Sequence, residues 1–116
     1  MDPCENQVLS RASSPDGAKD AIVFVRDCGA TTSYSTQVSV VPKGTPFLTT
    51  PTEWSSTPSG NALIVSGGDR KSPATVEVEW AGNGRLVIRR DSNAEVFVAE
   101  ASVLSVALEY EERFPK

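Results

Sequence analysis

The sequence has no histidine and only two cysteines among its 116 residues. Histidine is the commonest general base near neutral pH and the commonest metal ligand, so its absence excludes Ser-His-Asp and Cys-His catalytic sets. Two cysteines without histidine do not supply the three or four ligands of a usual zinc site. We therefore expect a protein that is not an enzyme and that uses no metal and no cofactor.

Positive charge and long apolar runs are also scarce. Eleven Lys and Arg oppose fifteen Asp and Glu, for a net charge of −4, and the basic residues are scattered. A nucleic-acid-binding surface needs clustered cations, so we expect no nucleic-acid partner. No apolar run approaches the roughly 20 residues that cross a bilayer, so we expect no transmembrane segment. The sequence specifies no oligomeric state.

Alternating apolar and polar residues run through most of the chain, which predicts β-strands. The clearest strand covers residues 19–27, with Ala21, Val23 and Val25 on one face. Further strands are expected at residues 6–12, 33–41, 61–66, 74–80, 85–89, 95–100 and 103–110. A chain of this length forms one domain. We predict an all-β fold, a single antiparallel domain of seven or eight strands in a sandwich or meander, with residues 1–5 and 111–116 frayed.

The sequence of residues 74–89 predicts a hairpin. A three-residue loop at residues 82–84, with Gly84 in a left-handed bulge position, places Glu77 opposite Arg89 as a favourable cross-strand pair. A two-residue Asn-Gly loop would instead place Val78 opposite Arg89. We favour the three-residue loop.

The last expected strand carries alternate apolar residues. A helix is the alternative, because Ala, Leu and Glu favour helices. As a strand, it directs four side chains toward the core: Leu104, Val106, Leu108 and Tyr110.

Residues 45–60 form the longest segment without strand character. Three prolines interrupt a Ser- and Thr-rich sequence, and Phe47, Leu48 and Trp54 are its only large apolar residues. Proline removes backbone donors, so this segment is predicted to be a long loop. Trp54 either contacts a partner or packs back and fixes the loop to the sheet.

Six consecutive hydroxyl side chains occupy residues 31–36, beside Cys28. They either line a polar groove or satisfy nearby backbone groups at a turn and strand start. Combined with the long loop, they define a candidate binding surface that comprises Thr31, Thr32, Tyr34, Thr36 and Trp54.

Two charged pairs are weaker candidates. Arg26 and Asp27 are either a recognition pair or a surface ion pair. Glu77 and Glu79 share a strand face about 7 Å apart, a spacing suited to calcium or to acid–base work on a glycoside. A solvated face explains the glutamates better, because Arg89 is expected opposite Glu77.

Cys4 and Cys28 permit one pairing. A disulfide across this separation stabilises by about 3 kcal/mol in an oxidising compartment. Two buried free thiols in a cytosolic protein are the alternative, and spacing alone leaves both open.

Four motifs together resemble a family of small uncharacterised bacterial envelope proteins that often carry a lipoprotein-type or secretory leader. They are CEN at 4–6, SPDG at 14–17, RDCGATT at 26–32 and STQVSVVP at 35–42. The resemblance covers most of the chain, and it is most specific in the first half. It implies an oxidising compartment, a Cys4–Cys28 disulfide and a periplasmic or cell-envelope location. It implies no activity and no catalytic residue. The start at Met1, without a leader, keeps a cytoplasmic location as the alternative.

The function expected from these features is that of a non-enzymatic binding or accessory module on the envelope side. Its partner is expected to be another protein or an envelope component. The alternative is an inhibitor or immunity-type protein that caps a partner. A small hydrolase that uses a carboxylate pair such as Glu77 and Glu79 is the least favoured interpretation.

Overall fold

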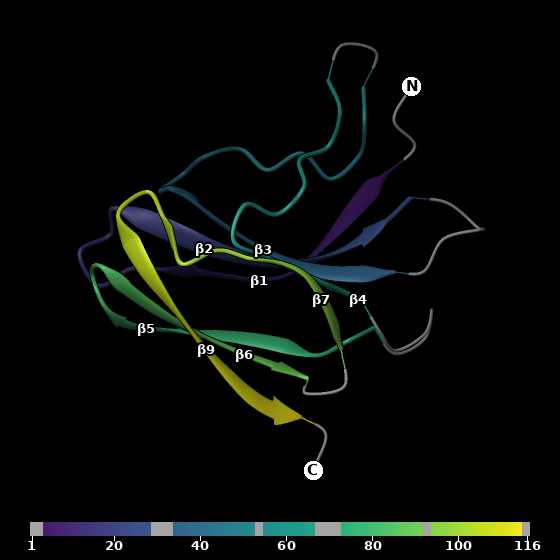
Figure 1. The fold of residues 1–116 in the computed structure, drawn as a ribbon. Helices are drawn as coiled ribbons and strands as arrows, with labels where there is room; N and C mark the ends of the chain where they lie inside the picture. Colours follow the sequence, from purple (N-terminus) through teal and green to yellow (C-terminus); the bar gives the residue numbers. More distant parts are fainter. Residues whose placement is uncertain (1–3, 29–33, 53–54, 67–72, 92–93, 115–116) are drawn as a thin grey trace.

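A computed structural model describes residues 4–28, 34–52, 55–66, 73–91 and 94–114 (Figure 1). Over these residues the chain forms nine strands and no helix, which confirms the all-β prediction. The strands are β1 (Glu5–Ser13), β2 (Lys19–Asp27), β3 (Ser35–Pro42), β4 (Leu63–Ser66), β5 (Val76–Gly82), β6 (Arg85–Asp91), β7 (Glu95–Ala99), β8 (Ser102–Val103) and β9 (Val106–Phe114).

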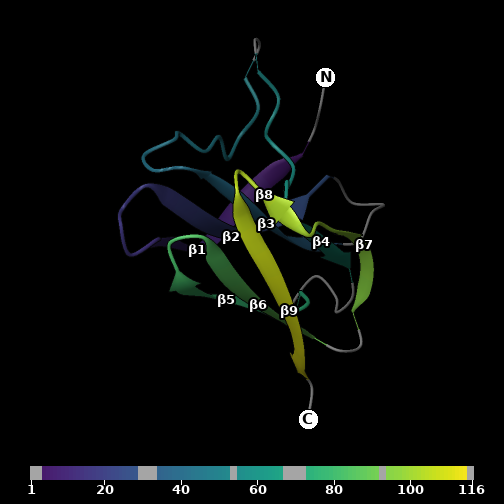
Figure 2. The same ribbon diagram turned by 60° about the vertical axis from the view of Figure 1, so that its left-hand side comes forward.

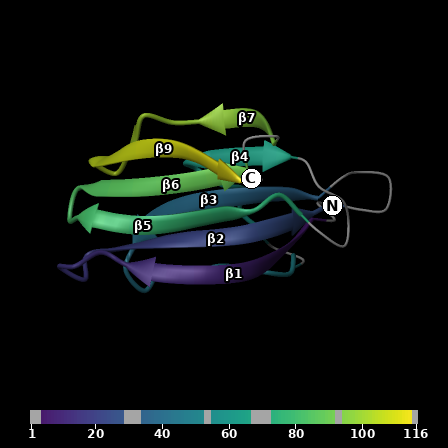
Figure 3. The same ribbon diagram turned by 90° about the horizontal axis from the view of Figure 1, so that it is seen from below.

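Two sheets pack face to face as a sandwich. One sheet has five strands in the order β1-β2-β3-β4-β7, and the other has four in the order β5-β6-β9-β8. Seen from below, the strands of the two sheets run in similar directions (Figure 3), as in aligned sheet packing. The inward-facing positions of both sheets form one apolar core that consists of Ala21, Val23, Val38, Val40, Ala62, Leu63, Val65, Ala74, Val76, Leu86, Ile88, Val106 and Leu108.

The C-terminal strand differs from the prediction in two ways. The predicted strand is divided by a turn at Leu104 and Ser105, whose φ angles are 52° and 65°. Leu104 is therefore 47% exposed and does not face the core, whereas Val106 and Leu108 do. After the turn, β9 pairs with β6 in parallel, so the domain is not wholly antiparallel.

β9 continues to Phe114, so residues 111–114, for which the sequence predicts fraying, are assigned to a strand. Two cross-strand ion pairs hold this part of β9 against β6. Arg89 Nε lies 3.1 Å from Glu111 Oε1, and Arg90 Nη2 lies 3.0 Å from Glu112 Oε2. At the other end of the chain, Glu5 belongs to β1 and Cys4 is buried.

The β5–β6 hairpin has the predicted register but a different turn. Glu77 pairs with Arg89. Only Asn83 and Gly84 lie between the strands, and the extra residue is a bulge in β5 between Trp80 and Gly82. Gly84 therefore does not occupy the predicted left-handed position.

The long loop contacts part of the face of the five-stranded sheet that is turned away from the core, at β1, β2 and β3 (Figures 1 and 2). Phe24, on that face of β2, contacts Phe47 of the loop edge to face, with ring centroids 4.7 Å apart. The loop returns to the sheet at Gly60, where an added Cβ would lie 2.9 Å from the carbonyl oxygen of Val38. Only glycine permits this close approach.

Hydrogen bonds from three side chains fix the end of the loop to β1 and β2. Arg26 Nη1 donates to Pro58 O at 2.7 Å, and to Asn6 Oδ1 and Thr57 Oγ1 at 3.1 Å each. Asn6 Nδ2 also donates to Pro58 O, at 2.8 Å, and the Thr57 hydroxyl donates to Cys4 O at 2.7 Å. We call Asn6, Arg26 and Thr57 the polar latch.

A second polar tie holds the start of the loop. The Asp20 carboxylate accepts from Arg11 Nε at 2.8 Å and from the Gly44 amide at 3.3 Å. Arg11 Nη2 in turn donates to Thr45 O at 2.8 Å. The loop is thus anchored at both ends by charged side chains of β1 and β2.

Candidate functional site

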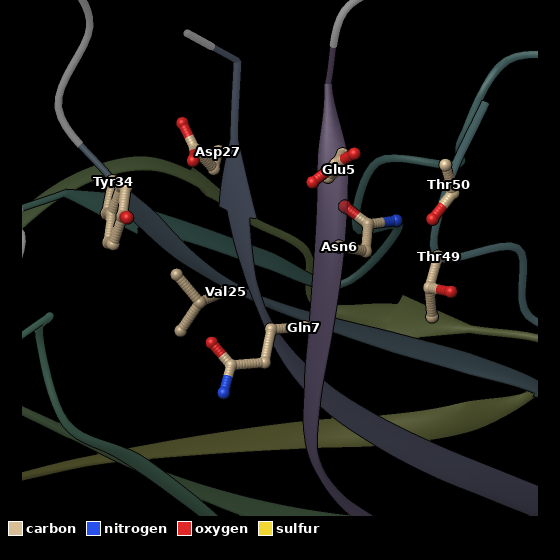
Figure 4. Close-up of a pocket in the computed structure, with 8 residues that line it drawn as sticks. All are labelled: Glu5, Asn6, Gln7, Val25, Asp27, Tyr34, Thr49 and Thr50. Carbon is tan, nitrogen blue, oxygen red and sulfur yellow. The ribbon is translucent and has the colours of Figure 1, made fainter. Parts of the chain in front are cut away.

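A groove lies beside the first residues of β1, where two hollows adjoin. Both are lined by Gln7, Val25 and Tyr34. The first hollow, which we call the mouth, has a volume of about 200 Å³ and is shown in Figure 4. The second, which we call the slot, has a volume of about 340 Å³. Shared walls make the two hollows parts of one groove.

The mouth is acidic. Glu5 and Asp27 pair directly across β1 and β2, and both line the mouth (Figure 4). Thr49 and Thr50 supply hydroxyl groups from the long loop. The backbone amide of Asn6 donates to Thr49 O at 2.8 Å and holds that part of the loop beside β1. Among the described residues that line the mouth and the slot, none is Lys or Arg.

The slot is largely apolar. Its floor consists of three buried side chains, Val25, Ala74 and Val76, and Leu9 stands at its rim with 53% of its surface exposed. Leu9 lies at a bulge in β1, between Val8 and Ser10, where the strand loses its regular pairing with β2. Bulges redirect side chains at sheet edges, and this one places Leu9 along the slot.

The position of the slot follows from how the sheet edges meet. The slot lies between β1, an edge strand of one sheet, and the start of β5, an edge strand of the other. Near the far end of β5, Trp80 Nε1 donates to Ala12 O at 2.9 Å and joins the two edges. The edges of the two sheets are therefore joined by a hydrogen bond at one end, and the slot lies between them at the other end.

Two of the five predicted binding residues lie within the described part of the chain. Tyr34 is half-buried and lines both hollows. Thr36 does not belong to a surface, because it is fully buried and its hydroxyl donates to Ala74 O at 2.6 Å. For Thr36, the alternative of a hydroxyl that satisfies a backbone group is the correct one. Thr31, Thr32 and Trp54 lie outside the described residues.

Cys4 and Cys28 form a disulfide, in agreement with the pairing that the resemblance implies. The alternative of two free thiols is wrong. The disulfide joins the start of β1 to the end of β2, next to Glu5 and Asp27 in the mouth. It therefore fixes the spacing of the two strands where the acidic pair lies.

Arg26 and Asp27 serve different parts of the molecule. Successive side chains of a strand point to opposite faces. Arg26 lies on the face covered by the loop, where it forms the polar latch, whereas Asp27 lines the mouth. They therefore do not form one recognition pair.

Glu77 and Glu79 lie away from the groove, and neither lines the mouth or the slot. Glu79 Oε1 is 2.8 Å from Arg89 Nη2, and this hydrogen bond raises the pKa of Arg89. Arg89 thus pairs with Glu79 and Glu111 and not with Glu77, the residue directly opposite. Over the described residues, no group of three or more acidic or cysteine side chains is arranged to hold a metal ion.

Sequence reasoning missed Glu5, Gln7 and Leu9 as groove residues. A signal for Glu5 was present, because a Cys4–Cys28 bridge between antiparallel strands puts residue 5 opposite residue 27. No comparable signal connects Leu9 with residues 73–76, which lead into β5 of the other sheet.

Over the part of the chain that the structure describes, no helix has the length and apolar character needed to span a membrane. No protein-family model, curated protein or solved structure matches this chain.

Proposed function

We propose that this protein is a non-enzymatic binding module that acts on the envelope side of a bacterial cell and binds a partner protein through the groove. The observation that carries the proposal is the groove itself, with Tyr34 between an acidic mouth and an apolar slot. Binding sites commonly combine apolar walls with a few convergent polar groups. The Cys4–Cys28 disulfide supports an oxidising compartment, and the motifs that resemble those of bacterial envelope proteins are consistent with this location.

The groove is better suited to binding than to catalysis. Acid–base catalysis by two carboxyl groups usually places one of them in an apolar site. Glu5 is exposed at the sheet edge, and Asp27 is directly opposite it. Among the described residues, the other side chains of the mouth are amides, hydroxyls, a valine and a tyrosine, groups that can position a ligand by hydrogen bonds and contacts.

The test is partner capture with matched variants. Immobilised wild-type protein, Tyr34→Ala and Leu9→Ala are compared with Phe97→Ala, which removes a 59% exposed side chain from β7 at the opposite edge of the same sheet. We expect the two groove variants to lose a partner that wild type and Phe97→Ala retain. Thermal unfolding should show that Leu9→Ala and Phe97→Ala remain as stable as wild type. Equal capture by all four proteins would contradict the proposal.

A second candidate function is that of an inhibitor or immunity-type protein that uses the long loop. The loop projects from the sandwich (Figure 2) and is anchored at both ends by charged side chains. Near its tip, the Thr52 amide donates to Ser55 O at 2.9 Å. A preorganised loop loses little entropy on binding, which suits an inhibitor. Loss of partner capture by Trp54→Ala, with capture retained by Leu9→Ala, would favour this function over the groove.

A further inference from the structure

We propose that Asn83 is a site of spontaneous covalent modification, at which the folded protein converts the side-chain amide into a carboxylate through a cyclic imide formed with Gly84. The two residues form the turn between β5 and β6, beside the β1–β2 turn (Figures 1 and 3). The slot lies at the start of β5, so this turn is at the end of the sandwich away from the groove. The inference therefore goes beyond the proposed function.

The reaction needs no reactant other than water. The backbone nitrogen of Gly84 attacks Cγ of Asn83 and loses its proton, and the side-chain nitrogen leaves as ammonia, which closes a succinimide ring. Water then opens the ring at one of its two carbonyl carbons. Opening at one carbon gives aspartate, and opening at the other gives isoaspartate, in which the backbone runs through the side-chain carbon. Each product has lost ammonia and gained water, and no atom is oxidised or reduced.

The turn leaves the attacking nitrogen accessible. Asn83 and Gly84 are both exposed, and Gly84 has no side chain to shield its nitrogen. The nearest atom to an added Cβ at Gly84, beyond its chain neighbours, would be Ser105 O at 3.8 Å. Over the described residues, the structure gives the Gly84 amide no hydrogen-bond acceptor, whereas the Gly84 carbonyl accepts from the Ala107 amide at 2.8 Å. The nitrogen is therefore not engaged in another contact that ring closure would have to break.

A hydrogen bond from the β1–β2 turn holds the Asn83 side chain. The backbone amide of Asp16 donates to Asn83 Oδ1 at 2.8 Å. Oδ1 gains negative charge when the Gly84 nitrogen adds to Cγ, and a hydrogen bond to a charged acceptor is stronger than one to a neutral amide. The Asp16 amide therefore stabilises the intermediate more than it stabilises the starting side chain.

The adjacent Asp16–Gly17 pair is protected from the same reaction. An aspartate followed by glycine closes this ring readily only when its carboxyl group is neutral, because an ionised carboxylate is a poor electrophile. Hydrogen bonds from the Ser14 hydroxyl and the Ala18 amide hold the pKa of Asp16 below its usual value, so the group is ionised at neutral pH. The Gly17 amide also donates to Ser14 O at 2.8 Å. Of the two turns in contact, the β5–β6 turn is therefore the reactive one.

The modification changes the contact between the two turns. Aspartate in place of Asn83 keeps an oxygen that can accept from the Asp16 amide, although it adds a carboxylate to this contact. Isoaspartate also adds a carbon atom to the backbone of a turn that closes between the paired residues Gly82 and Arg85. The longer backbone does not fit the same two-residue turn. We expect the isoaspartate form to lose the contact with the β1–β2 turn and the aspartate form to retain it.

The experiment follows the folded protein at pH 8 in water labelled with ¹⁸O, with peptide mass mapping at intervals. We expect both products to appear at Asn83, with ¹⁸O in the new carboxyl group. Asn6 and Asn61 are internal controls and should stay unchanged, because neither precedes glycine and both side chains are held by hydrogen bonds. Gly84→Ala should slow the conversion by about tenfold or more, because the methyl group shields the attacking nitrogen. The open space at Gly84 admits this methyl group, and urea unfolding checks that the variant remains folded.

Two results would overturn the inference: no conversion of Asn83 in the folded protein, or conversion in Gly84→Ala at the wild-type rate. The effect on the turn is tested with the modified protein, which ion exchange separates because it carries one more negative charge. We expect it to unfold at a lower urea concentration than Asn83→Asp, which contains the aspartate product alone. Equal unfolding midpoints for the modified protein, Asn83→Asp and wild type would contradict the predicted loss of the contact between the turns.

Discussion

The two faces of the five-stranded sheet are covered in different ways. The inner face packs against the second sheet through apolar side chains such as Val23 and Val40, in a core that includes Leu86 and Ile88. The outer face contacts the long loop over part of its area, and the loop is held by the Phe24–Phe47 contact and by hydrogen bonds from charged and amide side chains. The core removes a large apolar surface from water, whereas the loop depends on a few directional contacts. The loop should therefore open more easily than the sandwich.

The largest loss of stability is expected from a substitution in the core, on the inner face of the sheet. Ile88 is fully buried, and Ile88→Ala should lower the free energy of unfolding by about 4 kcal/mol, because it removes apolar contacts and leaves a cavity. Urea denaturation measures the change. Phe97→Ala, at an exposed position, is the control and should cost less than about 1 kcal/mol. A smaller loss for Ile88→Ala than for Phe97→Ala would contradict the assignment of the core.

Removal of the Cys4–Cys28 disulfide should cause the second-largest loss in the free energy of unfolding. Replacing both cysteines with serine opens a link across a sequence separation of 24, which should cost about 3 kcal/mol. The variant should also be cut faster by protease within residues 45–60, because Cys4 O accepts from Thr57 of the latch. Wild type treated with a dithiol reductant should match the variant in urea. An unchanged unfolding midpoint in both would show that the strand ends are held without the bridge.

A substitution in the polar latch should lower the free energy of unfolding by a smaller amount and should mainly affect the long loop. Arg26→Met removes three hydrogen bonds from a charged donor and should cost about 2 kcal/mol while increasing protease cleavage of the loop. Arg85→Met is the matched control, because its ion pair with Glu109 joins two side chains that are about half exposed. Such pairs contribute less than about 1 kcal/mol. Equal cleavage of the two variants would show that Arg26 does not hold the loop.

Loss of the hydrogen bonds to the Asp20 carboxylate should lower the free energy of unfolding least, and the size of this loss depends on pH. Hydrogen bonds from Ser13 and Arg11 hold the pKa of Asp20 below its usual value. Its stabilising contribution is therefore fully present above the unfolded-state pKa of about 3.9, and it is lost as the pH falls through the lower folded-state pKa. Urea midpoints between pH 7 and pH 2.5 should fall less steeply in Asp20→Asn than in wild type. Parallel curves would contradict the role of this carboxylate.

The strands that form the core could be predicted from the sequence, whereas the contacts that hold the loop on the outer face could not. Alternation with a period of two located the strands, and the Glu77–Arg89 register followed from counting residues around the turn. The latch joins Asn6 and Arg26 to carbonyl groups more than 30 residues away, and such contacts have no periodicity. The turn at Leu104 and Ser105 lacks the Gly or Asn that usually marks it.

The candidate site was predictable only in part, for the same reason. Tyr34 stood out within a run of hydroxyl residues, and the mouth follows from the disulfide once that pairing is known. The slot requires β1 and β5, from different sheets, to lie beside each other, which depends on how the sheets pack. Tertiary packing of this kind leaves no local pattern in the sequence.

Native-state hydrogen exchange tests the difference between the two faces most directly. The backbone amide of Asn6 donates to the loop carbonyl of Thr49, and the backbone amide of Gly60 donates to the Gln37 side chain. The backbone amide of Ile88 belongs to β6, which has a neighbouring strand on both sides. We predict that Asn6 and Gly60 exchange through an opening of lower free energy that depends little on denaturant, while Ile88 exchanges only by global unfolding. A single opening free energy and a single denaturant dependence for all three amides would contradict the account.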